Sequence, residues 1–229
     1  MSRLVAELAG EERVRAQRVL EDCASVELAS GAEVSAAELP AAVLLLVEQG
    51  VALLIAGTRH ATRRIVVAFA AGGGALLPPS DDELLRGLTP TRLTAVSRDA
   101  EHQLLREPAA ARAIACAAME ALADREESLA NFARFPHAER VRGKLLQLAR
   151  THGKVTDDGI LIDLPLTHEL IAESVGSTRE TVTLALRQLT RVGFLSRADR
   201  CFRVHLPAAE VAAGSRLPVR NPTTRLDAP

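Results

Sequence analysis

The stretch that decides the fold is LTHELIAESVGSTRETVTLALRQL, residues 166–189. Thr167 is a good N-cap for a short helix that ends near Val175, and Gly176 supplies the permissive backbone that a tight turn needs. A second helix is expected next, because its apolar residues recur at positions i, i+3, i+4 and i+7. They are Val182, Ala185, Leu186 and Leu189.

The spacing within this stretch predicts a helix-turn-helix over residues 166–190. Counted from His168, the small Ala172 is fifth, Gly176 is ninth and Val182 is fifteenth. The small residue lets the two helices cross closely, the glycine makes the turn, and the branched residue fills the angle between the helices. Since any two helices around a glycine turn can imitate this pattern, the flanking segments also have to agree with it.

The outward face of the second helix predicts contact with double-stranded DNA. We expect Arg179 to bridge guanine O6 and N7 and Glu180 to accept from cytosine N4, because the first turn enters the major groove. Ser177 is expected to form a capping box with Glu180. The alternative is that Arg179 and Glu180 are only a solvated charge pair plus a cap. Contacts to the DNA backbone are expected from Thr167, Ser177, Thr178, Thr183, Arg187, Arg197 and Arg200.

Segments on both sides of the motif predict a winged domain. A short hairpin of residues 154–156 and 160–164 is expected before it. Gly193 can end the second helix, and residues 194–197 can then pair with residues 201–205 as a wing. Basic side chains on a wing contact phosphates, which gives salt-dependent affinity without sequence information. The wing arginines are Arg197, Arg200 and Arg203.

The front of the chain predicts a β-roll preceded by one helix. Residues 3–20 read as an amphipathic helix whose apolar points include Val14. From residue 24 to about residue 96, short apolar runs alternate with Gly, Pro and Asp, which favours a small sandwich or β-roll. Residues 78–85 are expected to interrupt this pattern with a helix capped by Ser80 or Asp81, and residues 98–106 to form another short helix.

A long helix is expected over residues 108–133, followed by a hinge at Phe135-Pro136 and a further helix over residues 136–151. Along the long helix, steps of four and three mark a heptad seam that predicts a two-helix dimer, with Glu126 as its one polar interruption. Packing of this helix on its own β-domain is the alternative. The seam residues are Ala115, Met119, Leu122 and Leu129.

These segments give an α+β protein in four parts. Residues 1–107 are expected to form a β-roll, and residues 108–135 the dimerisation helix and hinge. Residues 136–206 are expected to form the winged helix-turn-helix, and residues 207–229 a disordered tail rich in Pro, Arg and Ala.

Charge and composition agree with a sensor joined to a nucleic-acid binder. Residues 1–135 hold 14 arginines and no lysine against 19 acidic residues, a balance of −5. Residues 136–229 hold 14 basic against 10 acidic residues, a balance of +4. The chain has no Trp or Tyr and only five Phe, so it lacks the aromatic platforms on which many RNA and single-strand binders depend.

The sequence indicates no metal, cofactor or enzyme activity. Its three cysteines are scattered, its six histidines show no ligand spacing, and no catalytic set or phosphate-binding loop is found. Cys116 could form a disulfide between subunits, but a buried small apolar residue is the expectation. Since neither a signal peptide nor a stretch long enough to span a membrane is found, we expect a cytoplasmic protein.

With the β-roll, long helix, hinge and winged motif in this order, the sequence resembles the Crp–Fnr family of bacterial regulators. The specific part of the resemblance is residues 166–195, above all VGSTRETVTLALRQLTRVGFL. The resemblance implies a homodimer that reads a two-fold symmetric DNA site, with Arg179 and Glu180 on the bases and RNA polymerase as a further partner. Some members carry a contacting arginine where this chain has Leu184, so its half-site should differ from theirs.

The match to nucleotide-binding members of the family is looser. Their Gly-Glu pair is absent at residues 72–79, which read GGGALLPP and predict a turn, and Arg92 is a poor substitute for their phosphate-binding arginine. The prediction is therefore a homodimeric, sequence-specific transcription regulator that cyclic AMP does not control and whose effector is unknown. The alternatives are a regulator activated by a cyclic nucleotide or other small ligand, and a sensor module that acts through a protein partner.

Overall fold

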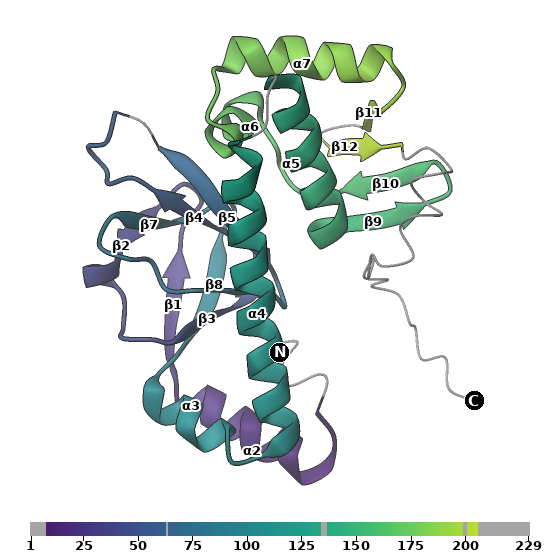
Figure 1. Cartoon of the computed structure of the whole chain (residues 1–229). Helices are drawn as coiled ribbons and strands as arrows, with labels where there is room; N and C mark the ends of the chain where they lie inside the picture. The colour runs from purple at the N-terminus through teal and green to yellow at the C-terminus, as the bar shows by residue number, and fades with distance from the viewer. Residues whose placement is uncertain (1–7, 63, 134–136, 199–200, 206–229) are drawn as a thin grey trace. The chain divides into compact units, whose positions relative to one another are not determined.

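The computed structural model describes residues 8–62, 64–133, 137–198 and 201–205 (Figure 1). The chain divides into two compact units, Met1–Leu129 and Ala130–Pro229. The expected hinge at 135–136, Arg200 of the wing and the tail 207–229 lie outside the described residues.

The first unit is built on two antiparallel four-stranded sheets, as the expected β-roll requires. One sheet has the order β1-β8-β3-β6 and the other the order β2-β7-β4-β5. Strands β3, β4 and β5 are buried along most of their length, which explains why they read as continuous apolar runs. The strand bounds are β1 Ala24–Leu28, β2 Glu33–Ser35, β3 Leu44–Gln49, β4 Val51–Ala56, β5 Ile65–Ala71, β6 Ala75–Leu76, β7 Glu83–Gly87 and β8 Thr91–Val96.

The helix expected over residues 78–85 is wrong, because this segment runs into strand β7. The capping contacts are present: the amide and the hydroxyl of Ser80 donate to Glu83 Oε2 over 3.0 and 2.9 Å. Leu84 and Leu85 nevertheless pair with Ile55 and Leu54 of β4. Pairing with a distant strand and burial of both leucines therefore override the local helix signal.

Among the described residues of the first unit, three α-helices pack on the β-roll and one short 3₁₀ helix follows β2. They are α2 (Gly10–Glu21), the short 3₁₀ helix η1 (Ala36–Glu38), α3 (Arg98–Leu104) and α4 (Pro108–Asn131). Helix α2 begins later than expected, since Leu8 and Ala9 are not helical, and Val14 is half exposed and not in the core. Leu20, Leu104 and Ile114 from three of these helices share one core with strand residues Leu44 and Val96.

Helix α4 both packs on the β-roll and keeps an apolar stripe in solvent. Its buried residues include Ala113, Ile114 and Ala121. Arg125 Nη2 lies 2.7 Å from the buried carboxylate of Glu83 on β7, and Asp124 accepts a hydrogen bond from the Phe69 amide of β5 over 3.3 Å. The seam residues, by contrast, are exposed. We expected packing on its own domain as an alternative to a seam. Helix α4 packs on its own domain with one face, and the seam residues lie on another face of the same helix.

The second unit is a winged helix-turn-helix of three helices and one sheet. The helices are α5 (His137–His152), α6 (His168–Val175) and α7 (Arg179–Arg191). The sheet has the order β11-β12-β10-β9, so the wing hairpin lies beside the hairpin that precedes the motif. Its strands are β9 Gly153–Thr156, β10 Gly159–Ile162, β11 Leu195–Ala198 and β12 Cys201–Val204. No described helix is both long and apolar enough to cross a membrane.

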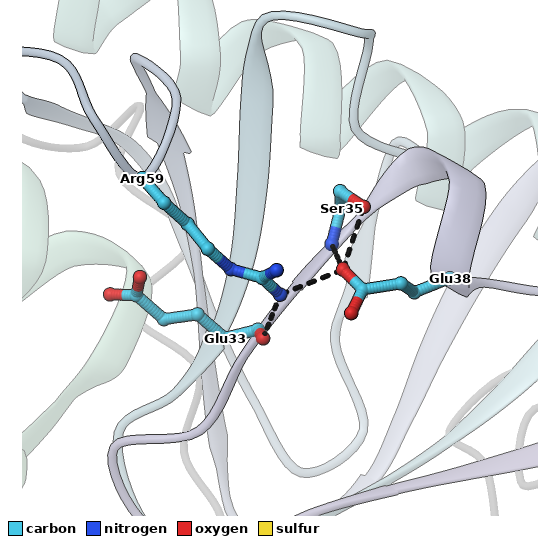
Figure 2. Close-up of polar contacts among 4 residues, drawn as sticks. All are labelled: Glu33, Ser35, Glu38 and Arg59. Carbon is cyan, nitrogen blue, oxygen red and sulfur yellow. Dashed lines mark hydrogen bonds and ion pairs between the residues drawn. The ribbon is translucent and has the colours of Figure 1, made fainter.

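A polar cluster on the β-roll joins η1 to the loop after β4 (Figure 2). Arg59 Nη2 donates to the Glu33 carbonyl and to Glu38 Oε2, each over 2.7 Å. The Ser35 hydroxyl and amide donate to the same carboxylate oxygen over 2.7 and 2.8 Å. The bonds from Ser35, and then the charge of Arg59, lower the pKa of Glu38 from 4.5 to about 2.

We expect the Glu38 cluster to contribute stability that disappears in acid. A carboxylate with a lowered pKa in the folded state stabilises fully above its unfolded value and loses this contribution as pH falls from about 4.5 towards 2. The variant Glu38→Gln should therefore be less stable than wild type at pH 6, and the difference should shrink at pH 3. Thermal unfolding followed by circular dichroism at both pH values measures this. Arg59→Met should show a smaller change of the same sign, and an equal difference at both pH values would contradict the assignment.

Candidate nucleic-acid interface

The turn between α6 and α7 is built on one left-handed residue. Thr167 caps α6, and its hydroxyl accepts from the Leu170 amide over 3.1 Å. The helix ends at Gly176, whose φ of 59° and ψ of 47° suit glycine. A Cβ at Gly176 would also stand 3.1 Å from a ring carbon of Phe132, so the position has little room for a side chain. The predicted bounds of the first helix and its turn are confirmed.

The cap of α7 differs from the expected one. Thr178 is the N-cap and its hydroxyl accepts from the Thr181 amide over 3.3 Å, so the expected capping box of Ser177 with Glu180 is wrong. Ser177 lies one residue too early to cap, and its hydroxyl contacts His137 Nδ1 at 3.3 Å. Because the helix begins at Arg179, Arg179 and Glu180 are its first two residues.

Helix α7 presents one buried and one exposed face. The expected stripe of Val182, Ala185, Leu186 and Leu189 is buried. Arg179, Glu180 and Arg187 are exposed, and among the described residues neither arginine forms an ion pair. Adjacent residues of a helix do not face each other, which is why Arg179 and Glu180 do not neutralise one another. The exposed face therefore offers two uncompensated cations and one carboxylate.

His168 links the two helices and sits in a positive field. Its Nδ1 lies 2.9 Å from Thr183 Oγ1, which itself donates to the Arg179 carbonyl over 2.8 Å. The single hydroxyl proton serves one acceptor, so His168 donates from Nδ1. Burial lowers the pKa of His168, and the charges of Arg197, Arg179 and Arg187 lower it further. These three arginines, from the wing and the second helix, thus all disfavour a positive charge on His168.

The wing contributes unevenly to this surface. Arg197 on β11 is exposed, and its guanidinium lies 5.6 Å from the centre of the Phe202 ring. Arg203 is largely covered, with 26% of its side chain exposed, and its Nη1 lies 3.7 Å from Asp158. The strand alternation turns Arg203 towards the preceding hairpin, so its expected place on the wing surface is not supported.

Sequence reasoning missed a network that supports the turn. Arg140 of α5 donates to the Val175 carbonyl over 3.2 Å and lies 2.8 Å from His137 Nδ1. The side-chain amide of Asn131, at the end of α4, donates to the Arg140 carbonyl over 2.8 Å. The available signal was the spacing of Asn131, His137 and Arg140 around the break, but the Val175 carbonyl comes from a distant part of the chain.

Residues 72–74, where nucleotide-binding members of the family carry their Gly-Glu pair, form a tight turn, as expected. Gly73 joins β5 to β6 with a φ of 89°, and its amide donates to the Val47 carbonyl over 2.7 Å. Arg92 Nε is 3.1 Å from Glu27, and both side chains are more than half exposed. Arg92 is therefore paired on the outer surface of its sheet.

The predicted seam is a stripe of exposed side chains on α4. Met119 is 70% exposed, Leu122 47% and Leu129 49%, and Ala115 is exposed as well. Cys116 is also exposed, which corrects the expectation of a buried small residue, because it points away from the face of α4 that packs on the β-roll. No cluster of three metal-binding side chains occurs among the described residues.

The comparisons with known proteins agree with this arrangement. Residues 139–209 match the Crp-like helix-turn-helix domain. The chain is 46% identical over 65 residues to the global nitrogen regulator of Synechocystis sp., a match that covers 28% of this chain and 29% of that protein. The similarity in sequence thus spans less than a third of that relative's length.

Two solved structures resemble most of the chain. A mutant of CooA from Carboxydothermus hydrogenoformans has a TM-score of 0.70 and 17% identity, with 86% of this chain and 89% of that chain covered. A transcriptional regulator of the CRP/FNR family from Thermus thermophilus has a TM-score of 0.57 and 19% identity, with coverages of 83% and 97%. At these identities the likeness concerns the fold. Residues 139–209 are thus similar to the Crp-like helix-turn-helix domain, and the chain shares its fold with these two solved structures.

Proposed function

We propose that this chain is a transcription regulator that binds a two-fold symmetric DNA site as a homodimer. The observation that carries the proposal is the exposed face of α7, where Arg179 and Arg187 have no ion-pair partner among the described residues. A polyanion that approaches this face meets cations whose charge is not already neutralised. The match of residues 139–209 to a Crp-like helix-turn-helix domain supports the same function.

Within this proposal the first turn of α7 enters the major groove, which is about 12 Å wide and admits one helix. Arg179 donates to the O6 and N7 atoms of a guanine, and Glu180 accepts from a cytosine amino group. Their place at the start of the helix suits this role, since the N-terminal residues of a recognition helix contact base edges. Both side chains are exposed, so no internal contact has to break before they reach the bases.

Backbone contacts come from the residues around that turn. The exposed Thr167 and Thr178 cap the two helices, and Arg187 and Arg197 flank them. Thr183 belongs to the proposed set as a donor, and its hydroxyl would turn from the Arg179 carbonyl to a phosphate oxygen when DNA binds. Ser177 and Arg200 complete the proposed set.

The exposed stripe of α4 supports the homodimer. Three large apolar side chains at heptad spacing remain in solvent in the single chain: Met119, Leu122 and Leu129. Two copies of α4 packed along this stripe would bury all of them, as in a two-stranded coiled coil. A two-fold dimer places its recognition helices about 34 Å apart, one turn of the DNA helix. RNA polymerase is a further partner in this proposal.

The ion pairs of the β-roll support the proposal that cyclic AMP does not control this protein. Glu33 lies 2.7 Å from Arg86 and also pairs with Arg64, while Glu83 pairs with Arg125. A cyclic phosphate would have to displace a carboxylate of the chain from one of these guanidinium groups. A buried anion requires such partners, and Arg64, Arg86 and Arg125 are already paired with carboxylates of the chain.

We expect Arg179→Ala to weaken sequence discrimination. Loss of one bidentate contact to guanine costs about 1–3 kcal/mol, or roughly 5- to 150-fold in Kd for the specific site. Arg197→Ala should instead weaken specific and non-specific binding alike. It should also reduce the salt dependence of the binding constant by the amount expected for about one phosphate contact. Fluorescence anisotropy with a site selected from a random DNA pool measures both variants. Arg98→Ala, an exposed arginine of the first unit, serves as the control. Failure of the wild-type protein to enrich any sequence would overturn the proposal.

We expect Leu122→Glu to convert the dimer into a monomer. A carboxylate buried without a partner costs about 3 kcal/mol, which raises the dimer Kd by on the order of 100-fold. Leu105→Glu is a matched control, because Leu105 and Leu122 are both 47% exposed and only Leu122 lies on the stripe. Sedimentation velocity distinguishes the outcomes. A dimeric Leu122→Glu variant, or a monomeric wild type, would refute the assigned interface.

We expect cyclic AMP and cyclic GMP to give flat calorimetric titrations with the full chain. The physical reason is that Arg86 and Arg125 are paired with carboxylates of the same unit. Glu83→Gln, which removes the carboxylate from Arg125, tests whether the internal anion is what prevents binding. Saturable heat of binding with the wild-type protein would favour a regulator activated by a nucleotide.

A further inference from the structure

The exposed face of α7 carries one apolar residue that the proposed contacts do not use. Leu184 is 65% exposed, and it is the one large hydrophobic side chain exposed between Arg179 and Arg191 among the described residues. The buried stripe lies on the opposite side of the helix. Leu184 therefore takes no part in holding α7 to the rest of the unit.

Its position distinguishes Leu184 from the single apolar residues that any protein surface carries. It follows Glu180 by four residues and precedes Arg187 by three, and residues at these spacings are neighbours on a helix surface. Leu184 thus lies in the middle of the face that bears the base-reading carboxylate and the unpaired arginine. A side chain there enters the major groove with the first turn.

The groove offers one apolar group for such a side chain to contact. This group is the C5-methyl of thymine, which lies in the major groove and which apolar side chains recognise. Leu184 is about 6 Å further along α7 than Glu180, which corresponds to about two base pairs. A leucine has no hydrogen-bonding atom, so at this place it discriminates by methyl contact alone.

We propose that Leu184 is a specificity-determining residue that packs against the methyl group of a thymine about two base pairs from the pair read by Glu180. This inference rests on the proposed function, since it requires α7 in the major groove. It adds an apolar contact to a half-site otherwise read by Arg179 and Glu180.

The test removes the methyl group from the DNA and the side chain from the protein. In the selected site, each thymine is replaced in turn by uracil, which lacks the C5-methyl, symmetrically in both half-sites. For the wild-type protein at one thymine we expect Kd to rise about fourfold for each half-site, the effect of one buried methyl group, or roughly fifteenfold for the pair. Leu184→Ala should bind the thymine and uracil sites equally.

Two further variants make the result specific. Leu184→Met keeps an apolar side chain and should retain the methyl dependence. Val192→Ala removes another exposed side chain, 67% exposed and just beyond α7, and should retain the dependence as well. Both substitutions, like Leu184→Ala, fall on exposed positions and should leave the fold intact.

The outcomes separate this inference from the proposed function. Wild-type binding that is indifferent to the methyl group at every thymine overturns the role of Leu184, and so does a half-site without thymine in that range. A methyl dependence that survives in Leu184→Ala overturns it equally. In each of these cases a sequence is still enriched, so the proposed function stands. Absence of any enriched sequence overturns the proposed function itself.

Discussion

Gly176 ends α6 in the left-handed conformation, and the Phe132 ring lies against the place where its side chain would begin. Backbone of this kind costs an ordinary residue roughly 1–2 kcal/mol. The turn sets the direction in which α7 leaves α6, and Val182, Leu186 and Leu189 then bury one side of α7. Every exposed side chain of α7 takes its direction from this packing. The candidate interface is therefore a consequence of one turn and one apolar stripe.

The same arrangement explains how several arginines share a small surface. Arg179, Arg187 and Arg197 all lie near enough to His168 to lower its pKa. A protonated histidine would add a fourth positive charge, but burial and these neighbours favour the neutral ring, which holds Thr183 through its Nδ1 proton. His168 thus joins α6 to α7 without adding to the repulsion. Among the described residues Arg179 and Arg187 have no ion-pair partner, and a phosphate backbone would supply one.

The winged unit was readable from the sequence because its signals are local. Caps, a glycine turn and the apolar period of α7 all occur within 25 residues, and the structure places them nearly as expected. The errors arise where distant residues decide. Ser80 and Glu83 make the contacts of a helix cap, yet pairing of Leu84 with Ile55 makes the segment a strand. Arg203 likewise turns to Asp158, a partner 45 positions earlier in the chain. The supporting bonds of Arg140 depend on the folded unit in the same way.

Two polar contacts fasten helix α4 to the β-roll. Asp124 accepts from β5 and Arg125 pairs with the buried Glu83 of β7, so two successive residues fasten the helix to two strands. Removing one partner of a buried ion pair typically costs about 3–5 kcal/mol, which makes this contact hard to exchange for a ligand. A ligand shifts a conformational equilibrium only by its differential affinity for the two states. The anion that faces Arg125 belongs to the chain, so under the proposed function the position of α4 on the β-roll would not require a charged ligand. Under the proposed function, the exposed stripe of α4 would then be available to a second copy whenever the chain is folded.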